Sequence, residues 1–89
     1  MRDALSSTQI QCLKDLSTDV DTDGWGPEDM GFGIKTRYRT YNSRTADKLF
    51  GLGMVERKLI LGEGPDLMTR HTLARRKHRL TEAGKETLR

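Results

Sequence analysis

The clearest pattern of apolar residues lies in the middle of the chain. Three of them follow one another at a spacing that places them on one face of a helix: Ala46, Leu49 and Leu52. Gly53 comes directly afterwards, and a glycine there accepts the left-handed conformation that ends many helices. From Val55 onward the pattern is that of a strand. Together these patterns predict a helix over residues 42–52 that leads directly into a strand over residues 54–61.

An earlier amphipathic segment predicts the first helix, over residues 6–16. Ser6 and Gln9 form a candidate capping box. The apolar stripe that follows is made of Ile10, Leu13 and Leu16. Cys12 lies beside this stripe and is expected to be a small buried hydrophobe.

A second, shorter helix is predicted over residues 27–35. Pro27 favours a first turn, and the two acidic residues after it suit the positive end of a helix. Met30 and Ile34 lie one turn apart. Two glycines within the segment each cost a helix about 1 kcal/mol relative to alanine, so this helix is weakly specified.

The last third of the chain predicts a hairpin and a terminal helix. Glycines and a proline indicate a loop over residues 62–66. Residues 72–80 then return as the partner of the strand at 54–61. Thr81 is expected to cap a helix over residues 81–88. We therefore expect one α+β domain, residues 1–89.

Composition narrows the class of protein. The chain has 89 residues, 34% hydrophobic and 33% charged, which suits one small domain. No apolar run approaches the roughly 20 residues of a membrane span, and no secretory signal is visible. Cys12 is the only cysteine, so an internal disulfide is impossible and we expect a reducing, cytoplasmic location.

Charge is distributed unevenly along the chain. Residues 1–34 hold two Lys and Arg against seven Asp and Glu, a balance of −5. Residues 35–89 hold fourteen against six, a balance of +8. Such one-sided basic character is typical of a surface that faces a polyanion.

An acidic segment leaves one metal site open. Asp19, Asp21, Asp23 and Gly24 match the first half of an EF-hand calcium loop. The twelfth position would be Met30, where that loop needs a bidentate glutamate. An acidic turn whose aspartates bond their own backbone is the favoured interpretation, and calcium binding is the alternative.

Enzyme chemistry has little support. His71 and His78 are expected on opposite faces of the returning strand, so they do not form a metal pair. The chain shows no cysteine–histidine cluster, phosphate loop or nucleophile–base pair. We expect no catalytic activity and no cofactor.

The predicted order of elements is that of a helix-turn-helix followed by a β-wing. The chain resembles winged-helix transcriptional regulators of the MarR (multiple antibiotic resistance regulator) type. Residues 5–16 are similar to the family's opening Leu-Thr-x-x-Gln helix, and residues 49–57 to the Gly-Leu-Val-x-Arg segment that ends its recognition helix. Residues 79–84 are similar to its Leu-Thr-x-x-Gly segment. The resemblance implies a three-helix core with a wing, and double-stranded DNA as the partner.

On this interpretation the helix at 42–52 enters the major groove and the basic wing holds the backbone or the minor groove. The residues expected to contact DNA are Lys35, Arg37, Arg39, Asn42, Ser43, Arg44, Lys48, Arg70, Arg75, Arg76, Lys77 and Arg79. One of Tyr38 and Tyr41 should pack inward and the other outward. The long flanking helices of MarR dimers have no counterpart here, so we expect a monomer or weak homodimer. The competing hypothesis is a winged helix that binds a protein instead.

Overall fold

The structure is a computed structural model that describes residues 5–89. Its elements are α1 (Ser7–Thr18), β1 (Ile34–Lys35), β2 (Thr40–Tyr41), α2 (Ser43–Gly51), β3 (Val55–Ile60), α3 (Leu67–Thr72), β4 (Arg75–Leu80) and α4 (Glu82–Thr87). Strands β1 and β2 form one antiparallel pair and β3 and β4 another. The predicted α+β class is confirmed.

Helix α1 begins at the predicted capping box. The Ser6 hydroxyl accepts a hydrogen bond from the Gln9 backbone at 3.1 Å, and the Gln9 side chain accepts from the Ser6 backbone at 2.8 Å. The core face of α1 is made of Cys12, Leu13 and Leu16, all buried. The helix runs two residues further than predicted, to Thr18. Cys12 is a buried free thiol, as expected, and burial raises its pKa to about 12.

Helix α2 has the predicted beginning and end. The Asn42 side chain caps it by accepting from the Thr45 backbone at 3.0 Å. At the other end Gly53 adopts a φ of 75°. The Gly53 amide donates to Phe50 at 3.0 Å, and the Met54 amide donates to Leu49 at 2.9 Å. This pair of bonds is the Schellman motif, which turns the chain straight into β3.

The predicted helix over residues 27–35 is wrong. Instead, Asp29 pairs with Arg76 of β4 through two backbone hydrogen bonds of 2.8 Å, and it also bridges Ile34. Gly31 and Gly33 take φ values of 98° and 118°, which no right-handed helix contains. The long-range pairing with β4 therefore prevails over a weak local preference, and the expected helix-turn-helix lacks its first helix.

The predicted hairpin is present, but its return strand begins three residues late. Strands β3 and β4 pair from Val55 opposite Leu80 to Ile60 opposite Arg75. The residues before β4 form helix α3, whose N-cap Asp66 accepts from the Thr69 backbone at 2.7 Å. Arg70 and His71 therefore lie on a helix and not on a strand. Helix α4 follows as predicted, with Thr81 as its N-cap.

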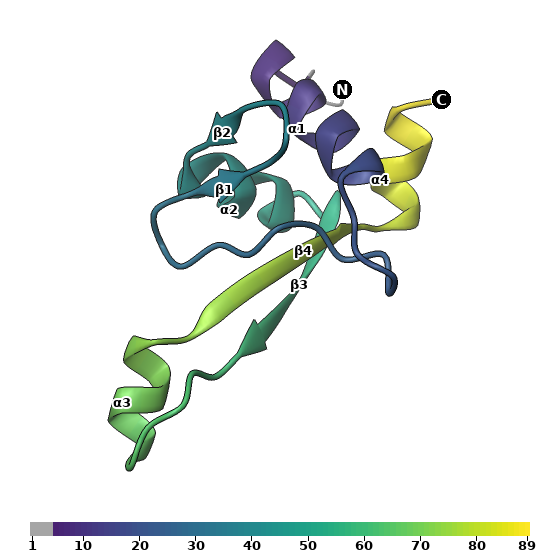
Figure 1. Cartoon of the computed structure of the whole chain (residues 1–89). Helices are drawn as coiled ribbons and strands as arrows, with labels where there is room; N and C mark the ends of the chain where they lie inside the picture. The colour runs from purple at the N-terminus through teal and green to yellow at the C-terminus, as the bar shows by residue number, and fades with distance from the viewer. Residues whose placement is uncertain (1–4) are drawn as a thin grey trace.

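The core lies where α1, β1, α2 and the base of the hairpin meet. Its fully buried side chains include Leu13, Ile34, Leu49 and Val55. The hairpin projects away from this body and carries α3 at its far end (Figure 1). The described chain consequently measures 47 × 28 × 22 Å.

Candidate nucleic-acid interface

Helix α2 is fixed by its buried face and presents a basic outer face. Ala46 and Leu49 are buried, whereas Arg44 and Lys48 are exposed. Neither cation forms an ion pair with any described residue. They are one helical turn apart and therefore lie side by side. Helix α2 therefore presents two exposed cations, unpaired within the described chain, on one face.

The other two residues predicted on this helix have structural roles. The Asn42 oxygen is occupied by the cap. The Ser43 hydroxyl donates to the carboxylate of Asp29, at 3.3 Å from each oxygen. Their side chains thus hold the start of α2 in place.

Helix α2 is joined to the hairpin by Arg57 of β3. Arg57 pairs with Asp47 on α2 and lies over the Phe50 ring, 4.6 Å from its centroid. Its Nε also donates to Nε2 of His78 at 3.0 Å. Because Nε2 accepts, the ring proton resides on Nδ1. That atom has no partner among the residues described.

His78 is wholly buried, and its environment disfavours protonation. Burial, followed by the nearby positive charge of Arg57, lowers its pKa to about 4. A neutral imidazole can accept the Arg57 hydrogen bond, whereas a protonated one cannot. The joint between α2 and the hairpin is therefore built for the neutral form.

The register divides the predicted wing cations between two faces. Val55, Arg57, His78 and Leu80 lie on the face that meets the core and α2. Alternation puts Arg76 on that same face. The opposite face, called here the reverse face, carries Glu56, Lys58, Ile60, Arg75, Lys77 and Arg79.

Acidic groups pair with three of the four cations of the reverse face, and Lys58 forms no ion pair with a described residue. Arg75 pairs with Glu28 at 3.1 Å, Lys77 with Asp21 at 2.9 Å, and Arg79 with Glu56. Two of these acids come from the negatively charged first third of the chain. Three of the five cations predicted on the wing are therefore paired with acids and are not free.

Trp25 completes the cover of the reverse face. Lys58 and Arg79 lie over its ring, with their charged groups 4.6 and 4.2 Å from ring centroids. Such cation–π contacts stabilise each pair by roughly 0.5–1 kcal/mol at partly exposed sites. The tryptophan thus fastens the acidic segment to the hairpin.

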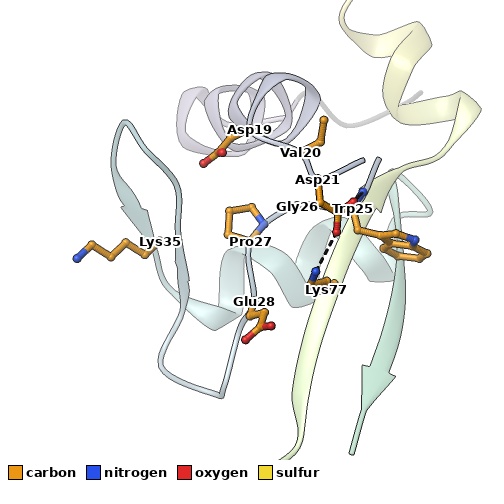
Figure 2. A pocket seen from close by; sticks show the side chains of 9 residues that line it. All are labelled: Asp19, Val20, Asp21, Trp25, Gly26, Pro27, Glu28, Lys35 and Lys77. Atoms are coloured by element: carbon orange, nitrogen blue, oxygen red, sulfur yellow. Dashed lines mark hydrogen bonds and ion pairs between the residues drawn. The ribbon is translucent and has the colours of Figure 1, made fainter. Parts of the chain in front are cut away.

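The acidic turn has the backbone-bonded form that the sequence favoured. One oxygen of Asp21 accepts from the amides of Asp23 and Trp25, each at 2.9 Å. Its other oxygen accepts a hydrogen bond from the Lys77 ammonium at 2.9 Å, drawn as a dashed line in Figure 2. The Lys77 hydrogen bond and then the Trp25 amide lower the Asp21 pKa to about 2.

The acidic side chains of the alternative calcium site are not brought together in the described structure. Asp19 is engaged with Arg37, accepting from its backbone at 2.7 Å. Figure 2 shows Asp19 and Asp21 pointing in different directions. No group of three or more His, Cys, Asp and Glu side chains able to hold a metal ion occurs within residues 5–89.

The predicted turn before α2 is a short hairpin, β1–β2. Tyr41 is buried and donates to the buried carboxylate of Asp15, while Tyr38 is exposed, as the one-in, one-out prediction required. Burial and the Asp15 carboxylate raise the Tyr41 pKa. Arg39 approaches Asp15 at 3.9 Å. Of the three cations predicted here, only Lys35 forms no ion pair with a described residue.

The interface that remains differs from the predicted one. Arg70 lies at the tip of the hairpin, where its Nε donates to the Gly64 carbonyl at 3.0 Å. Phe32 was missed by the sequence analysis, although its side chain is 89% exposed beside the start of α2. The glycines on either side of it were the available signal, because they favour a loop over a helix. The predicted contact cations without an ion pair in the described chain are Lys35, Arg44, Lys48, Arg70 and Arg76.

The comparisons add no relative to this picture. None of the helices in the described part of the chain is both long and apolar enough to cross a membrane. No protein-family model, curated protein or solved structure gives a significant match to this chain.

Proposed function

We propose that the chain binds double-stranded DNA, with α2 in the major groove, and acts in transcriptional regulation. The observation that carries the proposal is the state of α2. Both of its ends are fixed by hydrogen bonds, its inner face is in the core, and Arg44 and Lys48 point outward without a counter-ion in the described chain. A rigid helix with an unneutralised basic face suits a groove lined with phosphates.

Two other cations flank this helix. Lys35 lies on the β1–β2 hairpin just before α2, and Arg76 lies on the α2-facing side of β4. We infer that they hold the DNA backbone while Arg44 addresses a base edge. An arginine bidentate to guanine contributes about 1–3 kcal/mol of discrimination. The reverse-face cations are not part of this surface.

The architecture we infer is a variant winged helix related to the MarR type. Helix α2 acts as the recognition helix and β3–β4 as the wing. The segment around Asp29 and the β1–β2 hairpin stand in place of the first helix of the helix-turn-helix. Support comes from the direct passage of α2 into β3 through the Schellman motif.

A salt titration tests the proposal. The parent protein is mixed with a fluorescently labelled duplex of mixed sequence, and the dissociation constant is measured by anisotropy across a range of ionic strengths. The logarithm of the association constant should fall linearly with the logarithm of the salt concentration, by about 0.9 for each phosphate contact. Absence of binding at low salt would sink the proposal.

The tip of the hairpin favours a second candidate, binding to a protein. Leu67 is 61% exposed and Met68 80% exposed, and Leu73 and Leu61 are exposed close to them in the chain. Neighbouring exposed apolar residues are typical of protein contacts. A second copy of this chain is the partner that can be tested directly. Self-association in sedimentation velocity that disappears on Met68→Ser would support it, and a parent that stays monomeric at high concentration would remove it.

A further inference from the structure

The segment from Met30 to Gly33 exposes two large apolar side chains. Phe32 is 89% exposed and Met30 is 51% exposed. Phe32 is one of only two phenylalanines in the chain. Burying such a side chain contributes roughly 1.5–3 kcal/mol to folding, and the fold forgoes that gain here. An exposed aromatic side chain of this kind needs a reason outside the core.

The loop that carries Phe32 is firmly anchored. Asp29, at its start, is 2% exposed. Its carboxylate accepts from the Gly31 amide at 2.7 Å and from the Gly33 amide at 3.3 Å. The same carboxylate accepts from the Ser43 hydroxyl in the first turn of α2. Phe32 therefore sits between two backbone amides held by one buried side chain.

The loop also lies against the start of α2. A Cβ on Gly33 would come within 2.3 Å of the Tyr41 carbonyl and 3.3 Å of the Asn42 Cα, and its φ of 118° suits only glycine. Behind the loop, the backbone of Asp29 is paired with Arg76 of β4. The backbone of the loop that carries Phe32 is thus held against the N-terminal end of α2 and is tied through Asp29 to β4.

The surroundings of Phe32 indicate the kind of molecule that contacts it. A helix in the major groove meets base edges with its N-terminal residues, and here Arg44 occupies that end. The nearby cations Lys35, Arg44 and Arg76 form no ion pair with any residue from 5 to 89. An exposed apolar ring on a loop whose neighbouring elements carry these unpaired cations matches a nucleic acid, whose bases offer π faces and whose backbone offers phosphates.

We propose that Phe32 is a wedge that inserts between base pairs of the bound duplex DNA and bends it. The inference rests on the proposed DNA binding and adds a base-contacting residue outside α2. Apolar wedges of this kind unstack one base step and kink a duplex by about 20–90°. Met30 extends the apolar surface on the same loop.

The test compares Phe32→Ala with the parent and with two further variants. Phe32→Trp keeps a ring that can insert. Tyr38→Ala removes the exposed aromatic side chain of the neighbouring β1–β2 turn and is the matched control. Affinity is measured by anisotropy, and bending by energy transfer between dyes on the two ends of a short duplex. Thermal unfolding verifies that each variant is folded, which the exposure of both rings leads us to expect.

The parent should raise the energy transfer on binding. Phe32→Ala should abolish that rise and weaken binding by roughly 5- to 150-fold, the range seen when a stacking side chain is truncated. The salt dependence should stay unchanged, because no phosphate contact is lost. Phe32→Trp should retain the bend, and Tyr38→Ala should leave both readouts as in the parent.

The outcomes separate the inference from the function beneath it. If the parent binds DNA but Phe32→Ala binds and bends it equally well, the wedge is wrong and the DNA-binding proposal stands. The same holds if Phe32→Ala weakens binding while the parent leaves the duplex straight. If the parent binds no duplex at low salt, both proposals fall together.

Discussion

The two faces of the β3–β4 hairpin differ in how their charged residues are used. On the reverse face, Arg75, Lys77 and Arg79 are each paired with an acid. On the α2-facing side, Arg76 forms no ion pair with a described residue, and Arg57 is used to join β3 to α2. The comparison teaches that a count of Lys and Arg in a sequence does not show which of them are available to a partner. Ion pairing within the fold decides that.

The α2-facing side should depend most strongly on pH, through His78. Its folded-state pKa of about 4 lies below its ordinary value of 6.5, so between these values the unfolded chain binds more protons. The stability that neutral His78 contributes to the fold is present in full above pH 6.5. It is lost as the pH falls toward 4, which lowers the free energy of unfolding by about 3 kcal/mol.

Urea denaturation at a series of pH values measures this loss. His71→Gln is the matched control, because His71 is exposed on α3 and should leave the pH profile unchanged. His78→Gln should flatten the profile between pH 6.5 and 4. A parent that is equally stable at pH 7 and pH 4.5 would contradict this account of the joint.

The second largest effect is expected at Asp29, since its carboxylate ties the loop over residues 29–33 to α2. Asp29→Ala leaves two loop amides and the Ser43 hydroxyl without their acceptor. Loss of hydrogen bonds to a buried carboxylate should lower the free energy of unfolding by about 1.5–3 kcal/mol. Asp23→Ala, at an exposed position, should change it by less than about 0.5 kcal/mol. Equal effects of the two substitutions in urea denaturation would argue against an anchoring role.

The smallest effect is expected from the ion pairs that cover the reverse face. Arg75 and Glu28 have side chains 40% and 38% exposed, and exposed pairs contribute about 0–1 kcal/mol. Arg75→Ala should therefore lower the unfolding free energy by less than about 1 kcal/mol, and high salt should shrink the difference further. A loss that is large and independent of salt would show that this pair is structural.

Local sequence patterns were sufficient for the parts of the fold that local chemistry decides. The capping box at Ser6 and the Gly53 stop are each set by residues within a few positions of one another. Strand β3 followed from its apolar and β-branched residues, and β4 from its place as the return arm after the glycine-rich loop. Helix α3 was missed because it is six residues long and has no buried residue to mark it.

Long-range pairing explains the remaining errors. Residues 27–35 have helical start signals, but Asp29 pairs with Arg76 of β4. Its neighbour Glu28 pairs with Arg75, 47 residues further along the chain. Lys77 meets Asp21 across 56 residues. No short window of the sequence contains both partners of such a pair, so the ion pairs of the reverse face were not predictable from charge counts. The charge asymmetry between the two parts of the chain was visible, but it also drives the two parts together.

The central claim is that DNA contacts the face of α2 and not the reverse face of the hairpin. A comparison of two double variants in the salt titration tests it most directly: Arg44→Ala with Lys48→Ala, and Arg75→Ala with Lys77→Ala. Because Arg44 addresses a base edge, only Lys48 of this pair contacts a phosphate, so the first pair should reduce the salt slope by about 0.9 and should weaken binding at low salt. The second pair should leave slope and affinity close to those of the parent. A larger loss of slope from the Arg75 and Lys77 pair than from the Arg44 and Lys48 pair would contradict the account.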